Sequence, residues 1–184
     1  LLDDFFLKNQ VDQEKINQCM SWMDENKNIA VFSFWRTRGE NIPSEKYENF
    51  ELRPRKGEYK FNCQAAIWRR ERLIKFIRKH ESPWDWELLG SIRSRRYKDE
   101  FYSLMEGEKL PFDYDVGGVL HRGKWVLKHI KPIMEKYNLS INLNEFGYQE
   151  NWDTVIEVKP EKRTIMQKIV NRLKLYTTRI KSLI

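Results

Sequence analysis

The chain has 184 residues, which is enough for one domain with a sizeable hydrophobic core. Hydrophobic residues make up 40% of it and aromatic residues 14%, which excludes an intrinsically disordered chain. Its net charge of +7 indicates an anionic partner, such as a phosphate-bearing substrate, a nucleic acid or a membrane surface. No apolar run reaches the length of a membrane-spanning helix.

The first half of the chain mixes predicted strands and helices. Residues 1–6 ("LLDDFF") look like the end of a buried strand and a turn, and residues 11–26 have apolar side chains at helical spacing. The β-branched and aromatic residues 29–36 predict a strand. The polar residues 37–59 predict a long loop that contains at most a short strand. Residues 59–80 begin extended and become helical near Trp68 or Arg70.

The second half is predicted to be mainly helical. Residues 82–98 begin a helix, with Ser at the N-cap, Pro at N1 and an acidic residue at N3. Residues 109–125 predict a loop or short strand with a glycine pair, and residues 124–139 predict a helix that Pro132 kinks or divides. Because strands and helices mix, the predicted fold class is α/β, with α+β as the alternative.

Two adjacent carboxylates, Asp3 and Asp4, form the first candidate site. Like charges repel, so the pair either faces water in a turn or binds a cation. At the carboxyl end of a strand, such a pair can hold Mg²⁺ or Mn²⁺, which prefer oxygen ligands and often share them with substrate phosphates.

The second candidate site is "SPWDWEL", around Asp85. Ser82 and Asp85 fit a helix cap, which is a structural role. Trp84 and Trp86 flank the carboxylate, and large aromatic side chains can desolvate a carboxylate and suit it to act as a general base. The two interpretations are compatible, because a cap also fixes the position of the carboxylate.

The third candidate site is "VGGVLHRGKW", in which glycines surround His121 and Arg122 just ahead of a predicted helix. Exposed backbone N–H groups at a helix start, together with an arginine, can bind phosphate. The alternative is a plain glycine-rich connection with a histidine on the surface.

In this order, these stretches together with "FNCQAAIWRRERL" resemble the second half of a GT-A type glycosyltransferase, family 2-like, of bacterial surface polysaccharide synthesis. In such enzymes a nucleotide-binding half ends in a strand with a DxD-like acidic motif, and an "ED" motif precedes a later helix. The resemblance spans residues 1–125 and implies the C-terminal part of a GT-A-like mixed sheet flanked by helices. The base-binding segment of the family would lie upstream, so we expect this chain alone to be inactive.

The resemblance implies a role for each candidate residue. Asp3 and Asp4 would hold Mg²⁺ or Mn²⁺ with the nucleotide-diphosphate sugar, and Asp85 falls on the catalytic aspartate. Here the motif reads "WD" in place of "ED", which leaves the base to be either Asp85 or Glu87. The remaining implied roles are donor-diphosphate binding by His121 and Arg122 and acceptor binding by Trp84, Trp86, Trp68 and Gln64.

The function expected from this resemblance is sugar transfer to a glycan or lipid-linked acceptor in cell-surface polysaccharide synthesis. The alternatives are a nucleic-acid-binding module and a non-catalytic interaction domain. The basic run "RRERLIKFIRKH" favours the first of these. Nucleic acid is the less favoured partner, because acidic residues are spread along the whole chain and no recognition motif is present.

The end of the chain predicts a separate element. We divide the chain into a catalytic part, residues 1–160, and a basic amphipathic helix, residues 161–184, that can lie on an anionic membrane or pack on the domain. The two cysteines have no metal-site spacing and suit a reducing compartment, although a disulfide between them is left open. The expected location is the cytoplasm, at the inner face of the membrane.

Overall fold

The computed structural model describes residues 4–36, 39–57, 59–151 and 177. These residues form four helices and two mixed sheets, one of five strands and one of three, which confirms the predicted α/β fold class. The chain divides into two compact units. Unit 1 is built on the described residues between 9 and 113, and unit 2 on residues 4–8 and 114–151.

The sheet of unit 1 has the strand order β2-β3-β5-β1-β4. Its central strands, β1 and β5, are parallel, whereas β4 pairs with β1 and β3 pairs with β5 in the antiparallel sense. The bounds of the strands are β1 Ile29–Ser33, β2 Ile42–Pro43, β3 Phe50–Leu52, β4 Ala66–Trp68 and β5 Glu100–Leu104.

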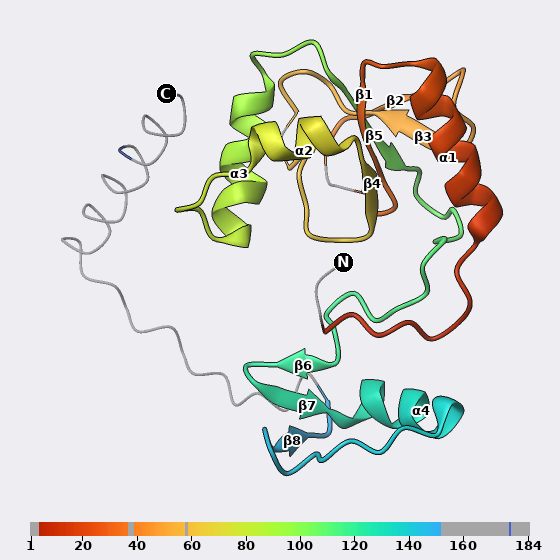
Figure 1. Ribbon diagram of the computed structural model, residues 1–184, viewed down its shortest axis with the longest axis vertical. Coiled ribbons are helices and arrows are strands. Elements are labelled where there is room, and N and C mark those ends of the chain that lie inside the picture. The colour runs from red at the N-terminus through yellow and green to blue at the C-terminus, as the bar shows by residue number, and fades with distance from the viewer. Residues whose placement is uncertain (1–3, 37–38, 58, 152–176, 178–184) are drawn as a thin grey trace. The chain divides into compact units, whose positions relative to one another are not determined.

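Helices cover both faces of this sheet (Figure 1). Neighbouring side chains of a strand point to opposite faces, so Phe32 and Val31 mark the two sides of β1. Phe32 packs against Trp22 of α1 (Gln13–Glu25), with ring centroids 5.7 Å apart. Val31 belongs to the opposite cluster, which includes Phe76 of α2 (Arg70–Phe76) and contacts Trp86 of α3 (Pro83–Ser94).

Helices α1 and α2 and strand β1 of unit 1 correspond to predicted elements. The predicted helix 11–26 corresponds to α1, which Asp12 caps by accepting a hydrogen bond from the Lys15 amide at 3.0 Å. The strand predicted over 29–36 is present but ends at Ser33, and the helix predicted to begin near Arg70 is confirmed. The segment 37–59 holds two short strands, β2 and β3, which is one more than expected. The central strand β5 was not predicted.

Unit 2 is a small sheet with one helix. Its strands β6 (Leu120–His121) and β7 (Lys124–Val126) are antiparallel, and β7 pairs in parallel with β8 (Tyr148–Gln149). Helix α4 (Leu127–Tyr137) packs Ile130 on the buried side of this sheet, close to Trp125. The helix continues through Pro132, so this proline does not divide it, and the alternative of a kink stays a prediction.

Among the helices that the structure describes, none has both the length and the hydropathy needed to cross a membrane. The predicted amphipathic helix 161–184 and the domain boundary after residue 160 lie outside the described residues, apart from Thr177. Both therefore stay predictions.

Candidate functional site

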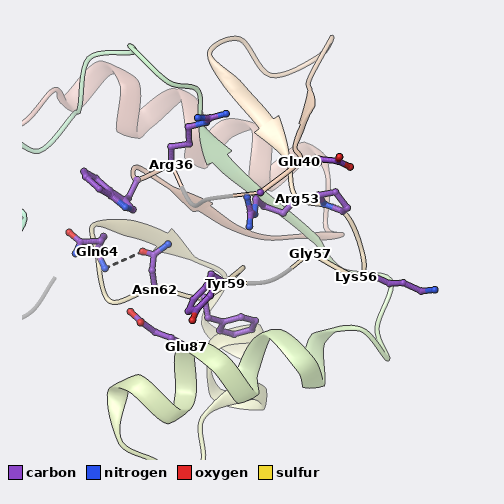
Figure 2. A pocket seen from close by; sticks show the side chains of 13 residues that line it. Arg36, Glu40, Arg53, Lys56, Gly57, Tyr59, Asn62, Gln64 and Glu87 are labelled. Carbon is purple, nitrogen blue, oxygen red and sulfur yellow. Dashed lines mark hydrogen bonds between the residues drawn. The ribbon is translucent and has the colours of Figure 1, made fainter. Parts of the chain in front are cut away.

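A cavity of about 940 Å³ lies within unit 1, on the side of the sheet that carries α2 and α3 (Figure 2). Two loops line it: the loop after β1, which includes Trp35, and the loop between β3 and β4, which includes Arg53, Tyr59 and Gln64. Glu87 reaches the cavity from α3. The cavity is therefore assembled from segments that are far apart in the sequence.

The face of the sheet beside this cavity is polar. Ser33, Glu51 and Ser103 are paired across neighbouring strands and lie on the same side of the sheet, and each is at most 5% exposed. Asn62 lines the cavity and donates a hydrogen bond to Ser33 Oγ at 3.1 Å. Because buried polar groups need partners, this face favours a polar ligand over a purely apolar one.

Glu87 is the carboxylate that is best placed within the cavity. Its Oε1 accepts a hydrogen bond from the Cys63 amide at 2.7 Å, which fixes the half-buried side chain. Figure 2 shows Glu87 pointing from α3 toward Asn62 and Gln64. Helix α3 approaches Phe61 closely at Gly90, one turn after Glu87. Because glycine has no side chain, the Phe61 ring packs directly against the helix backbone there. A fixed carboxylate beside two amide side chains can accept a proton from a bound hydroxyl group.

The Cys63 thiol beside this carboxylate stays protonated. Burial and, after it, the Glu87 charge raise the pKa of the Cys63 thiol to about 11. The thiolate is the nucleophilic form of cysteine, so Cys63 is a poor nucleophile near neutral pH. Cys19 and Cys63 are both free thiols.

The opposite wall of the cavity is basic. Arg53 is 4% exposed, and its Nη1 donates a hydrogen bond to Asn41 Oδ1. Asn41 in turn donates to Glu51, which also accepts from Arg36 Nε at 3.4 Å. Arg36 and Arg53 line the cavity together with Lys56 and Glu40, so three cationic side chains face a space that also contains the carboxylates of Glu40 and Glu87.

Lys60, next to this wall, is a buried cation. Its Nζ donates to the Arg55 carbonyl at 2.9 Å and lies 4.9 Å from the Phe101 ring centroid. Burial, and after it the charges of Arg95, Arg53 and Arg55, together lower the pKa of Lys60 to about 8. The folded protein therefore bears a cost for keeping Lys60 charged.

This cost predicts a pH dependence of stability that Lys60→Met removes. Below pH 8 the folded and unfolded states both hold the proton, and the cost is complete. From pH 8 to about 10, the unfolded state binds more protons, so the free energy of unfolding of the wild type rises relative to that of Lys60→Met. Urea unfolding at pH 7 and pH 9.5 measures this. Lys27→Met, at an exposed lysine, is the control, and parallel pH curves for wild type and Lys60→Met would contradict the prediction.

The Asp85 carboxylate caps α3. Ser82 Oγ accepts from the Asp85 amide at 3.2 Å, and Asp85 Oδ2 accepts from both the amide and the hydroxyl group of Ser82. This is the capping box that the sequence predicted, with Pro83 in the first turn. Asp85 is exposed and is not among the residues that line the cavity. Its role as a base stays a prediction, but the geometry favours Glu87.

The tryptophans predicted to bind an acceptor lie elsewhere. Trp68 and Trp86 pack against each other and Phe61 in the core of unit 1, with their ring centroids 5.8 Å apart. Trp84 is 78% exposed, and none of the three lines the cavity. Gln64 does line it, as does Trp35, which the sequence did not single out.

Of the two aspartates in the acidic pair, the structure describes only Asp4. Asp3 lies outside the described residues, and Asp4 belongs to unit 2. The Asp4 carbonyl accepts from the Val119 amide at 2.9 Å, and its carboxylate lies so close to Gly118 that a Cβ there would be 2.3 Å from Oδ2. Across residues 4–36, 39–57 and 59–151, no cluster of three or more acidic, histidine or cysteine side chains is arranged to bind a metal. The metal site stays a prediction.

His121 and Arg122 lie in a β-hairpin. His121 ends β6, and the turn to β7 is formed by Arg122 and Gly123, both with positive φ (50° and 76°), as in the tight turns that join antiparallel strands. Strand β7 separates this turn from α4, so the prediction that the loop opens directly onto a helix is wrong. Diphosphate binding by His121 and Arg122 stays a prediction.

The chain matches no protein-family model, and comparisons with curated proteins and with solved structures also found no match.

Proposed function

We propose that this chain is part of a glycosyltransferase that transfers a sugar from a nucleotide-diphosphate sugar to a glycan or lipid-linked acceptor in cell-surface polysaccharide synthesis. The observation that carries the proposal is the half-buried Glu87 carboxylate, which lines the cavity of unit 1 and accepts a hydrogen bond from the Cys63 amide. The resemblance of the sequence motifs supports the reaction class, and the position of Glu87 in the cavity supports its role as the base.

Glu87 is the general base in this proposal. An acceptor hydroxyl group must lose its proton as it attacks the donor sugar, and a positioned carboxylate can accept that proton. The amide of Cys63 donates to Oε1 of Glu87, and the Glu87 side chain lines the cavity, where an acceptor hydroxyl group can approach it. Asp85 is less suited to this role, because the Ser82 amide and hydroxyl group both donate to its Oδ2 at the start of α3.

The lining of the cavity suits a sugar acceptor. The rings of Trp35 and Tyr59 offer apolar surfaces for stacking, while the amides of Asn62 and Gln64 offer donors and acceptors for hydroxyl groups. The cavity volume of about 940 Å³ can hold more than one sugar residue. We therefore assign acceptor binding to Gln64, Asn62, Trp35 and Tyr59, and no longer to Trp68 or Trp86.

The donor side of the proposal rests on the sequence motifs. Asp3 and Asp4 would hold Mg²⁺ or Mn²⁺, and His121 and Arg122 would bind the donor diphosphate. A divalent cation supplies positive charge where the leaving diphosphate becomes more negative. Asp4 has the oxygen chemistry that either cation prefers, and Gly118 leaves room for its carboxylate, which a larger residue there would displace.

A transfer assay on the full-length protein that carries this chain tests the proposal. Release of nucleoside diphosphate is measured for a set of nucleotide sugars, with lipid-linked glycans as acceptors. We expect release from at least one donor that requires both an acceptor and a divalent cation, and a lower donor affinity by isothermal titration when EDTA is present. Absence of turnover with every donor, together with a donor affinity that EDTA does not change, would contradict the proposal.

A further inference from the structure

Helix α2 and the start of α3 expose three large apolar side chains. Ile74 is 55% exposed, Ile77 50% and Trp84 78%. Ile77 caps the end of α2, and Trp84 lies in the first turn of α3, after the connection 78–82. The two helices contact each other, and Figure 1 shows the connection between them extending away from the sheet.

The outward face of α2 is fixed by what its other face contacts. Residues three and four positions apart share one side of a helix, so Arg70, Ile74 and Ile77 lie together. Phe76 is fully buried on the other side, where Arg72 pairs with Asp99 at 3.0 Å. The isoleucines therefore cannot turn inward without displacing the core side of the helix.

Basic side chains surround these exposed apolar residues. The segment 69–80 contains six Lys or Arg residues and one acidic residue, Glu71. Arg70 and Lys79 are exposed, and neither forms an ion pair with any described residue. Arg78 donates to two carbonyl groups at the end of α2, which leaves its positive charge uncompensated. Exposed apolar side chains among available cations are the pattern of a surface that contacts an anionic bilayer.

We propose that this surface, the α2–α3 corner formed by Arg70, Ile74, Ile77, Arg78, Lys79 and Trp84, binds an anionic lipid bilayer. Ile74, Ile77 and Trp84 enter the headgroup region, and the cations bind lipid phosphates. A nucleic acid would use the same cations and can stack on Trp84, but the two exposed isoleucines offer it neither stacking nor hydrogen bonds, whereas a bilayer takes up all three apolar side chains. This inference does not depend on the proposed function. If the chain does transfer sugars, the same surface would bring it to a lipid-linked acceptor in the bilayer.

Brominated lipids test this contact. Vesicles of phosphatidylcholine and phosphatidylglycerol with bromine on the acyl chains quench tryptophan that enters the bilayer, and residues 161–184 contain no tryptophan. We expect the wild-type chain to bind and to be quenched, and Trp84→Phe to bind but lose at least half of the quenching. Ile77→Glu should bind about tenfold more weakly, because a buried apolar contact becomes a charge repelled by the lipid.

Met20→Glu is the matched control. Met20 is also 50% exposed, but it lies on α1, which covers the opposite face of the sheet, so vesicle binding should stay within about twofold of wild type. All of these variants change exposed residues, and equal melting temperatures would show that they fold. Equal weakening by Ile77→Glu and Met20→Glu, undiminished quenching in Trp84→Phe, or binding to an oligonucleotide but not to vesicles would overturn the inference. No donor or acceptor is added, so failure here leaves the transfer reaction untouched, and failure of transfer leaves vesicle binding to be observed.

Discussion

Glu87→Gln in the full-length protein is expected to lower the rate of sugar transfer by about 10²–10⁴, because glutamine keeps the shape of the side chain but cannot accept a proton. The amide of Cys63 can still donate to the side-chain oxygen, so the cavity should keep its form. The KM for the acceptor should therefore change much less than kcat. Steady-state kinetics with varied acceptor concentration would measure both quantities.

Asp85→Asn is the matched control for this experiment. Asparagine is also a good partner in a helix cap, so we expect near-normal transfer and a loss of stability of about 1 kcal/mol or less. Ser82→Ala should cost about 0.5–2 kcal/mol and leave the rate unchanged, since it removes the hydroxyl group of the same capping box. A larger loss of rate in Asp85→Asn than in Glu87→Gln would assign the base to Asp85.

Arg93→Met is expected to destabilise unit 1 by about 3–5 kcal/mol. The side chains of Arg93 and Glu81 are 4% and 1% exposed, and Arg93 Nη2 donates to Glu81 Oε2 and to the Phe76 carbonyl, both at 2.7 Å. Removing the guanidinium leaves a buried carboxylate without its cation, and it also leaves the carbonyl at the end of α2 without this donor. Chemical denaturation followed by tryptophan fluorescence would measure the loss.

The double variant Glu81→Leu/Arg93→Met should recover much of this stability, because it removes the buried charge as well as its partner. Lys27→Ala provides the surface comparison. Lys27 pairs with Asp24 at 3.2 Å, but both side chains are more than two-thirds exposed, so the loss should stay below about 1 kcal/mol. Similar losses for Arg93→Met and Lys27→Ala would show that burial does not govern the strength of these pairs.

Local signals in the sequence were sufficient for several elements. The N-cap serine, the proline and the acidic residue at N3 fixed the start of α3, because capping depends only on residues within one turn. Helical spacing located α1, and the aromatic and β-branched run at Ile29 located β1.

The strand β5 has no such local signal. Its residues Phe101 to Leu104 are all buried, since β5 is central and covered on both faces, so the alternation of polar and apolar residues is absent. A short apolar run of this kind does not distinguish a strand from a buried helical segment. Its pairing with β1 is also a contact between distant parts of the sequence, which no local pattern encodes.

The candidate site was predictable only in part. Gln64 and Glu87 were singled out from motifs, and both line the cavity. Trp35 and Arg53 were missed, because their segments carry no motif and meet the others only through the order of the strands. Trp68 and Trp86 were assigned to the acceptor from the motif resemblance, but both side chains are partly buried and pack against the core of unit 1.

The central position of β5 also determines when unit 1 can form during synthesis. Strand β5 joins the β1–β4 pair to the β2–β3 pair, and the two pairs have no contact in the sheet without it. A nascent chain that has not yet released Leu104 from the ribosome therefore holds two separate hairpin-like pieces, with one edge of β1 open to other chains. Contacts over such long sequence separations form slowly, so we expect newly made chains to depend on chaperones until this strand is inserted.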